Sequence, residues 1–473
     1  MKKRMSCAPL VMIAVVAMFF SCEEEVPTVH QIEESQGVAK EMGHLKQTKT
    51  YSAEVVQHWL ALQTAMLYDP ASKNASFGLN ANRIMAYSGV AAYEAVVPGM
   101  PAYQSLSGQL SEMPQMPKTE PGKAYHWPTS ANAALAEVSR ELFGVFYDAQ
   151  AAAQLEHELN QAAMLAIDNP EIFTRSVAFG KAVGAKIVEW AATDRPWTSW
   201  PVYTIPAWEP GVWNPMNGAT TVPNGLAYWG YTRTMVPGSI NNTVSPIMPY
   251  SEDPASAYYQ DMLEVYEVSM HLTLEERIQA KYYDDPASKG YPGGAHYYSV
   301  LTQVMEQLNP PLDLAAIGFA KAGMSLFDGT IGSFRAKFTY NTERPIQYIN
   351  RVFGATDPVA QHWTSYIPNP PYGDFPSNHA VFSSSFAHAL TTVFGDNVSF
   401  SNSTYAGKEV DLGGGFGIRD LGSRHYSSFY DMVQDIAYSR LFGGIHTRYA
   451  CEEGMKQGMK TAMNIDAKVS FKK

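Results

Sequence analysis

Three short segments in the last third of the chain carry residue types that can hold a tetrahedral oxyanion. They are Lys337-x6-Arg344-Pro345, Pro376-Ser377-Asn378-His379 and Ser439-Arg440-x5-His446. Arginine offers a planar fork of donors to an oxyanion, and lysine offers a compact positive charge. Histidine can act beside them as a ligand, a nucleophile or a proton carrier. The ordered set therefore predicts an oxyanion-binding active site.

The second segment stands where an apolar helix is expected to begin. Ser377 occupies the cap position, and Val381, Phe382 and Phe386 follow at helical spacing. Free N–H groups at a helix start and the helix dipole both favour an anion. Capping would explain Ser377, but it would not explain the imidazole of His379 beside the same N–H groups.

The cations of the other two segments must also be brought to that helix end. Lys337 and Arg344 are seven residues apart, so we predict that they face one side of a helix that Pro345 ends or kinks. Arg440 and His446 are six apart, which on a continuous helix gives different faces. Gly443 and Gly444 lie between them, and we predict a helix break there.

Helical periodicity extends through most of the chain from Tyr51 onward. Val55, Trp59 and Leu62 recur at helical spacing, and Asn169-Pro170 is a helix-start signal. Residues 194–250 are instead rich in Pro, Gly, Trp and Tyr, which indicates a long functional or packing loop. We predict an all-α fold of two helical bundles joined by this aromatic loop, with halves at 49–250 and 251–473.

The N-terminal segment predicts export. Lys2, Lys3 and Arg4 precede an apolar run from Leu10 to Phe20, and Cys22 follows it. We expect a lipoprotein signal at 1–21, lipidation of Cys22, a polar tether at 22–48 and a location on the periplasmic or cell-surface face of the outer membrane. Plain secretion is the alternative. Cys451 would then be the one remaining cysteine of the three, so no disulfide is expected.

The net charge of −11 argues against nucleic acid as a partner. We therefore expect Lys337, Arg344 and Arg440 to form a local positive site on an otherwise acidic protein. No later stretch is apolar enough for a membrane span, so the expected membrane contact is the lipid anchor.

The three motifs resemble the signature of the type 2 phosphatidic acid phosphatase and vanadium-dependent haloperoxidase superfamily. The resemblance implies that Lys337, Arg344, Arg440, Ser377 and the Asn378 N–H bind phosphate or vanadate. It implies that His446 is the axial ligand of vanadium or the nucleophile toward phosphorus, and that His379 is the general acid–base. Asp284 or Asp285 would hydrogen-bond His379, with Asp284 taken as the catalytic candidate, and Tyr372 would flank a halide.

The chain departs from the family pattern at two positions. Asn378 stands where glycine is usual, and asparagine tolerates unusual backbone angles. Ala450 stands where an aspartate often follows the histidine, so another group must orient His446.

The expected absence of membrane spans and the long N-terminal half resemble the soluble haloperoxidase branch. Asn82 to Tyr87 and Gly211 to Pro215 are similar to that branch. The resemblance implies a vanadate-dependent enzyme that oxidises a halide with hydrogen peroxide, in which Lys337 polarises the peroxide. One alternative is a phosphomonoesterase that needs no cofactor and uses His446 as nucleophile.

A different class is a non-catalytic surface lipoprotein that binds glycans or an oxyanion. Trp197, Trp200, Trp208 and Trp213 would be exposed in that case. The oligomeric state is open between a monomer and a homodimer.

Overall fold

The computed structural model of the chain describes residues 46–68, 77–144, 148–215, 218–285 and 293–473. The predicted signal, Cys22 and the tether up to residue 45 lie outside this range and stay predictions. Thr48, at the end of the predicted tether, is buried and donates its hydroxyl to Val96 O at 2.8 Å. Within the described ranges, no helix has the length and apolar character that crossing a membrane requires.

Helices make up most of the structure, as predicted, with 60% of the described residues in helices and 5% in strands. The helices of the first half are α2 (Glu54–Tyr68), α3 (Phe77–Val96), α4 (Trp127–Leu142), α5 (Ala149–Ala166) and α6 (Pro170–Ala191). Asn169 caps α6 by accepting a hydrogen bond from Glu171 N at 2.9 Å, which confirms the start predicted there.

The second half supplies the helices that surround the three motifs. They are α8 (Ala257–Met270), α9 (Leu274–Tyr282), α10 (Gly293–Leu308), α11 (Leu312–Tyr340), α12 (Pro345–Val352), α13 (Pro358–Gln361), α14 (Asn378–Phe394), α15 (Phe429–Phe442) and α16 (Arg448–Lys468). Shorter helical turns lie at Thr48–Thr50, Val97–Gly99, Pro196–Ser199, α7 (Asn224–Ala227), Trp229–Tyr231 and Phe353–Ala355.

Three short antiparallel ribbons were not expected from the sequence. They pair β1 (Tyr203–Thr204) with β2 (Thr221–Val222), β3 (Phe400–Asn402) with β6 (Arg424–Tyr426), and β4 (Glu409–Asp411) with β5 (Ile418–Asp420). Strands of two or three residues are too short to produce a recognisable alternation of apolar and polar residues.

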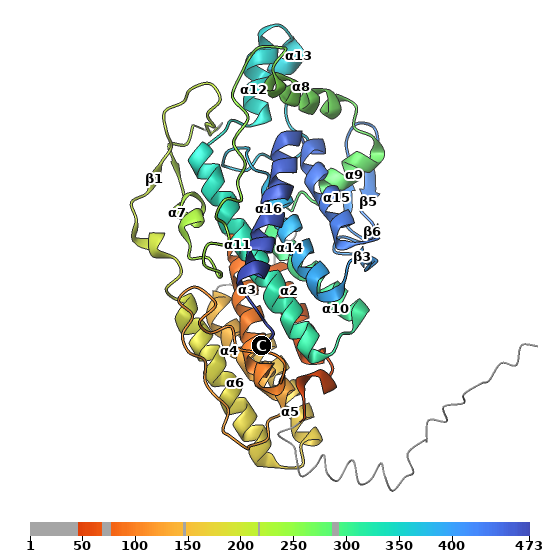
Figure 1. The fold of residues 1–473 in the computed structure, drawn as a ribbon. Helices are drawn as coiled ribbons and strands as arrows, with labels where there is room; N and C mark the ends of the chain where they lie inside the picture. The colour runs from red at the N-terminus through yellow and green to blue at the C-terminus, as the bar shows by residue number, and fades with distance from the viewer. Residues whose placement is uncertain (1–45, 69–76, 145–147, 216–217, 286–292) are drawn as a thin grey trace, which may run out of the picture. The chain divides into compact units, whose positions relative to one another are not determined.

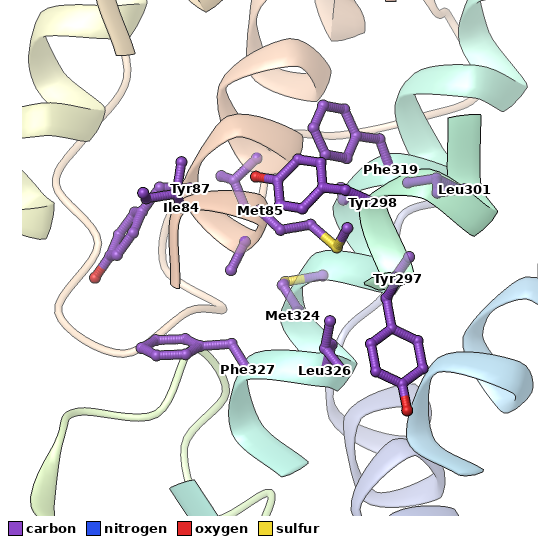
Figure 2. Close-up of a cluster of buried hydrophobic side chains, with 14 of the residues drawn as sticks. Ile84, Met85, Tyr87, Tyr297, Tyr298, Leu301, Phe319, Met324, Leu326 and Phe327 are labelled. Atoms are coloured by element: carbon purple, nitrogen blue, oxygen red, sulfur yellow. The ribbon is translucent and has the colours of Figure 1, made fainter. Parts of the chain in front are cut away.

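Residues 44–473 form one compact unit in which α11 lies at the centre. It packs against α3 from the first half and against α14 and α16 from the second (Figure 1). A side chain at Gly323 would come within 2.7 Å of the Ala86 Cα, so glycine is what allows α3 and α11 to approach closely. Figure 2 shows part of the hydrophobic core that the two halves share. In it, Met85 of α3 lies close to Tyr298 of α10 and Met324 of α11.

The aromatic loop is fastened to α11. Asp328 accepts hydrogen bonds from Met235 N at 2.6 Å, Val236 N at 3.0 Å and the Ser239 hydroxyl at 2.7 Å.

The expectation that four tryptophans of this loop are exposed is wrong for two of them. Trp197 and Trp213 are buried in the core, whereas Trp200 and Trp208 are 38% and 50% exposed.

Candidate active site

The three sequence motifs meet where several helices of the second half begin or end. Lys337 lies in the last turn of α11, Arg344 directly before α12, Ser377 directly before α14, Arg440 in the last turn of α15 and His446 in the turn before α16. Helix ends are where backbone donors and charged side chains can converge on one ligand.

Lys337 and Arg344 do not share a helix, so this prediction is wrong. The helix α11 ends at Tyr340, and Asn341 takes a left-handed conformation with φ 45°. Arg344 is the cap residue of α12, and Pro345 is its first helical residue. Proline therefore begins a helix here because its fixed φ suits the first helical position.

The predicted break between Arg440 and His446 is confirmed. The helix α15 ends at Phe442, and α16 begins at Arg448. Gly444 has φ 73°, a conformation that favours glycine, and it turns the chain so that His446 faces the site.

His446 is held between an acid and a cation. Its Nδ1 lies 2.5 Å from Asp374 Oδ1, and Arg344 Nη1 donates to its Nε2 at 3.2 Å. Because arginine can only donate, Nε2 carries the lone pair and the proton of the neutral ring lies on Nδ1. Burial and the charges of Arg344 and Lys337 lower the pKa of His446, which keeps the ring neutral.

Asp374 is thus the group that orients His446 in place of the aspartate missing at Ala450. Thr447 donates its hydroxyl to the other carboxylate oxygen at 3.3 Å. Burial raises the pKa of Asp374, and the charges of Arg344 and Lys337 oppose that rise. Sequence reasoning missed this residue, although it lies only three positions before Ser377.

The three cations are buried and are held mainly by backbone carbonyls. Lys337 Nζ donates to Gly373 O at 3.0 Å and Asp374 O at 2.8 Å, and Arg344 Nη1 donates to Ile445 O at 2.7 Å. Burial lowers the pKa of Arg344 to about 10 and also lowers the pKa of Lys337, with Arg344 adding to the latter effect. Buried positive charges that repel one another would be stabilised by a bound anion.

Three buried donor groups at this site have no hydrogen-bond partner among the described residues. They are Arg344 Nη2, Ser377 Oγ and Arg440 Nε. Ser377 stands at the cap position as predicted, but its hydroxyl does not cap the helix. A buried donor without a partner costs about 1–3 kcal/mol, more when it is charged. An oxyanion would supply acceptors for these groups.

The side chain of Asn378 is tied to neighbouring elements. Its Oδ1 accepts a hydrogen bond from the Ser333 hydroxyl of α11 at 2.5 Å, and its Nδ2 donates to the Tyr372 hydroxyl at 3.3 Å. The residue therefore keeps its backbone at the helix start while both ends of its amide are engaged elsewhere.

The ring of Tyr372 lies 5.2 Å from Lys337 Nζ and 5.5 Å from the guanidinium carbon of Arg344, which places it inside the cation cluster.

His379 contacts Asp285, and the catalytic assignment of Asp284 is corrected accordingly. His379 Nε2 lies 3.2 Å from Asp285 Oδ2. Asp284 instead acts on Arg440, whose pKa is lowered by burial and partly restored by the charge of Asp284. Burial and the charge of Arg440 lower the pKa of His379 to about 4. The side chain of His379 is 15% exposed, against 3% for His446, so it is the more accessible of the two rings.

A pocket of about 230 Å³ borders the site at Arg344. Its other walls are Trp213 and Pro215 of the aromatic loop, Ile346 and Gln347 of α12, and Asn369, Pro370 and Pro371. The pocket brings apolar and polar side chains next to Arg344, whose Nη2 has no hydrogen-bond partner among the described residues.

The chain is similar to vanadium-dependent haloperoxidases. Residues 318–471 match the family model described as the VCPO second helical-bundle domain. A solved structure described as the first bacterial vanadium-dependent iodoperoxidase is 27% identical, with a TM-score of 0.74, over 89% of this chain and 97% of that one. None of the curated proteins matches the chain.

Two further solved structures are the holo and apo types of a bacterial vanadium-dependent chloroperoxidase. They are 18% and 16% identical, each with a TM-score of 0.60 and 84% of this chain covered, and 93% and 95% of their own chains are covered. At that identity they show the fold alone, and the fold predicted from the motifs is confirmed.

Proposed function

We propose that this chain, a member of the vanadium-dependent haloperoxidase family by its fold and its second helical-bundle domain, binds vanadate and oxidises a halide with hydrogen peroxide. The observation that carries the proposal is the set of three buried donors without partners, Arg344 Nη2, Ser377 Oγ and Arg440 Nε. They lie around a histidine whose Nε2 lone pair is free of a proton.

Vanadate fits this donor set because it offers negatively charged oxygens to the cations and an electrophilic centre to Nε2. His446 would be its ligand, and the oxygens would take up the unpartnered donors. When bound, vanadate supplies Lewis-acid activation of hydrogen peroxide. Lys337 gives two of its three N–H groups to carbonyls, so the third N–H would be available to donate to an oxygen of the anion or of peroxide.

His379 would move the protons of the reaction. Its Nε2 faces Asp285, so Nδ1 would be the atom that accepts and returns a proton. The lowered pKa of His379 keeps the ring neutral at neutral pH, as a base requires. Iodide is the first halide to test, because the 27% identical relative is described as an iodoperoxidase.

The test is a paired assay on purified protein. Oxidation of iodide, bromide and chloride by hydrogen peroxide is measured with and without added orthovanadate, and hydrolysis of p-nitrophenyl phosphate is measured without it. Vanadate-dependent halide oxidation that His379→Ala reduces by about 100-fold or more is expected. Phosphate-ester hydrolysis together with no vanadate-dependent oxidation would overturn the proposal.

Phosphomonoester hydrolysis is the second candidate, and the state of His446 favours it. A neutral imidazole whose lone pair faces Arg344, with the charges of Lys337 and Arg440 nearby, is also the arrangement that a phosphohistidine mechanism needs. His446 would attack phosphorus, and His379 would protonate the leaving oxygen. Trapping of a phosphorylated His446 after acid quench would support this alternative.

A further inference from the structure

We propose that His296 is a positioning residue for His379, and that it acts through Asp285 together with Tyr405. This inference rests on the role proposed for His379. It concerns residues from α10 and from the loop after β3 that none of the three motifs contains.

The contacts form a continuous chain behind His379. Asp285 Oδ2 faces His379 Nε2 at 3.2 Å, and Oδ1 of the same carboxylate lies 2.9 Å from His296 Nδ1. The hydroxyl of Tyr405 donates to that Oδ1, also at 2.9 Å. Asp285, His296 and Tyr405 are all buried, so these hydrogen bonds are shielded from water.

The direction of the hydrogen bonds is fixed by Asn402 of β3. Its Oδ1 accepts from the Thr404 N–H at 3.1 Å and from the Thr404 hydroxyl at 2.6 Å, so its NH₂ group must face His296 Nε2, which is 3.1 Å away. His296 Nε2 therefore accepts, and the proton of the neutral ring lies on Nδ1 and is donated to Asp285. With two donors on Oδ1, the other oxygen of Asp285 is directed to His379 as an acceptor.

Asp285 needs such anchoring. It has a positive φ of 46°, which is uncommon for a residue other than glycine, and its side chain is 2% exposed. A buried carboxylate that loses one of its donors is expected to rotate toward other donors. Rotation of the Asp285 carboxylate would move its Oδ2 away from His379. The His379 proton would then no longer be held on Nε2, and the reactive lone pair would no longer be held on Nδ1.

The start of α10 lies beside His379. A Cβ added at Gly293 would be 3.8 Å from the ring carbon Cε1, and Tyr297 donates its hydroxyl to the His379 carbonyl at 3.3 Å. His296 lies between Gly293 and Tyr297 on α10. This part of the helix therefore contacts the backbone of His379 directly and its ring through Asp285. Residues that orient a ligand or base from behind typically contribute 10- to 100-fold.

The experiment measures the imidazole signals of His379 in histidine-labelled, vanadate-free protein, assigned by the loss of signals in His379→Gln. At neutral pH the wild-type ring should carry its proton on Nε2, with a sharp signal protected from exchange with water. His296→Leu should broaden that signal or add the other tautomer. His296→Asn should preserve it, because the asparagine amide can donate from the position of Nδ1.

His388→Leu is the matched control, because His388 lies on α14 between the Tyr430 hydroxyl and Asp466 without touching Asp285. It should leave the signal of His379 unchanged. With vanadate, His296→Leu should lower kcat by about 10-fold or more with little change in KM for the halide, and His296→Asn should restore most of it.

An unchanged Nε2–H signal in folded His296→Leu would overturn the proposal. If that variant does not fold, Tyr405→Phe removes the second donor from the same Oδ1, and an unchanged signal there would overturn it equally. Failure of the proposed function is seen separately, as a wild-type protein without vanadate-dependent oxidation, because the imidazole signals need neither vanadate nor turnover.

Discussion

Replacement of Asp374 by asparagine should weaken vanadate binding by about 10- to 150-fold. The side chains of Asp374 and His446 are 5% and 3% exposed, and the carboxylate lies 2.5 Å from Nδ1. A hydrogen bond to a charged group contributes about 1.5–3 kcal/mol, and each 1.4 kcal/mol corresponds to a tenfold change in affinity. An asparagine can also donate its NH₂ to Nδ1, which would move the ring proton to Nε2 and remove the lone pair from the site.

The assay is calorimetric titration of folded Asp374→Asn with orthovanadate, with folding checked by circular dichroism. Glu343→Gln is the matched control. Glu343 and Asp374 both line a small cavity that Met262 and Thr447 also border. The substitution therefore removes a second buried carboxylate near Asp374, but one that pairs with Arg351 at 3.1 Å and has no recorded contact with His446 among the described residues. Unchanged affinity in Asp374→Asn would refute the view that Asp374 sets the proton position of His446.

Three further predictions concern the residues at the start of α14. Ser377→Ala should lower vanadate affinity about tenfold without lowering the melting temperature, because its hydroxyl has no hydrogen-bond partner among the described residues; a lower melting temperature with unchanged affinity would contradict this. Asn378→Gly should cost about 1 kcal/mol in urea unfolding and keep anion binding, since the amide bonds Ser333 and Tyr372; a tenfold gain in affinity would show that Asn378 crowds the anion. The pKa of His379 is about 4 in the fold and about 6.5 in the unfolded chain, so the unfolded state takes up the proton first and stability should fall by about 3 kcal/mol from pH 6.5 to 4. His379→Gln should flatten that decline, and identical stability curves for the two proteins would contradict it.

The helical fold, and the helix ends at which the three motifs meet, could largely be predicted from the sequence because both leave local patterns. Ser377 before an apolar helix, paired glycines between Arg440 and His446, and Asn169-Pro170 are signals readable within a few residues. Local signals also show that Lys337 and Arg344 belong to different helices. Asn341 is a residue type that often ends a helix in the left-handed conformation, and Pro345 suits a helix start.

Asp374, Asp285 and His296 could not be predicted from local sequence patterns. Asp374 reaches His446 across 72 residues of sequence, and His296 reaches Asn402 across 106. The choice between Asp284 and Asp285 depends on the backbone angle of Asp285, which the tertiary structure sets. Such contacts leave no spacing in the sequence, since they depend on how distant helix ends are packed around α11.

Export and lipidation stay predictions, because residues 1–45 lie outside the described ranges. The division of the helical part into halves at 49–250 and 251–473 also stays a prediction. Mass spectrometry of the mature N-terminus would locate the cleavage and any lipid on Cys22. Retention of Cys22→Ser protein at the membrane would contradict the anchor.

A crystal structure of the protein soaked with orthovanadate would test the oxyanion site most directly. It should show vanadium bonded to His446 Nε2, with vanadate oxygens accepting hydrogen bonds from Arg344 Nη2, Ser377 Oγ and Arg440 Nε, the three donors that lack partners. Vanadium bound away from His446, or a site in which Arg344 still donates to Nε2 at saturating vanadate, would contradict it.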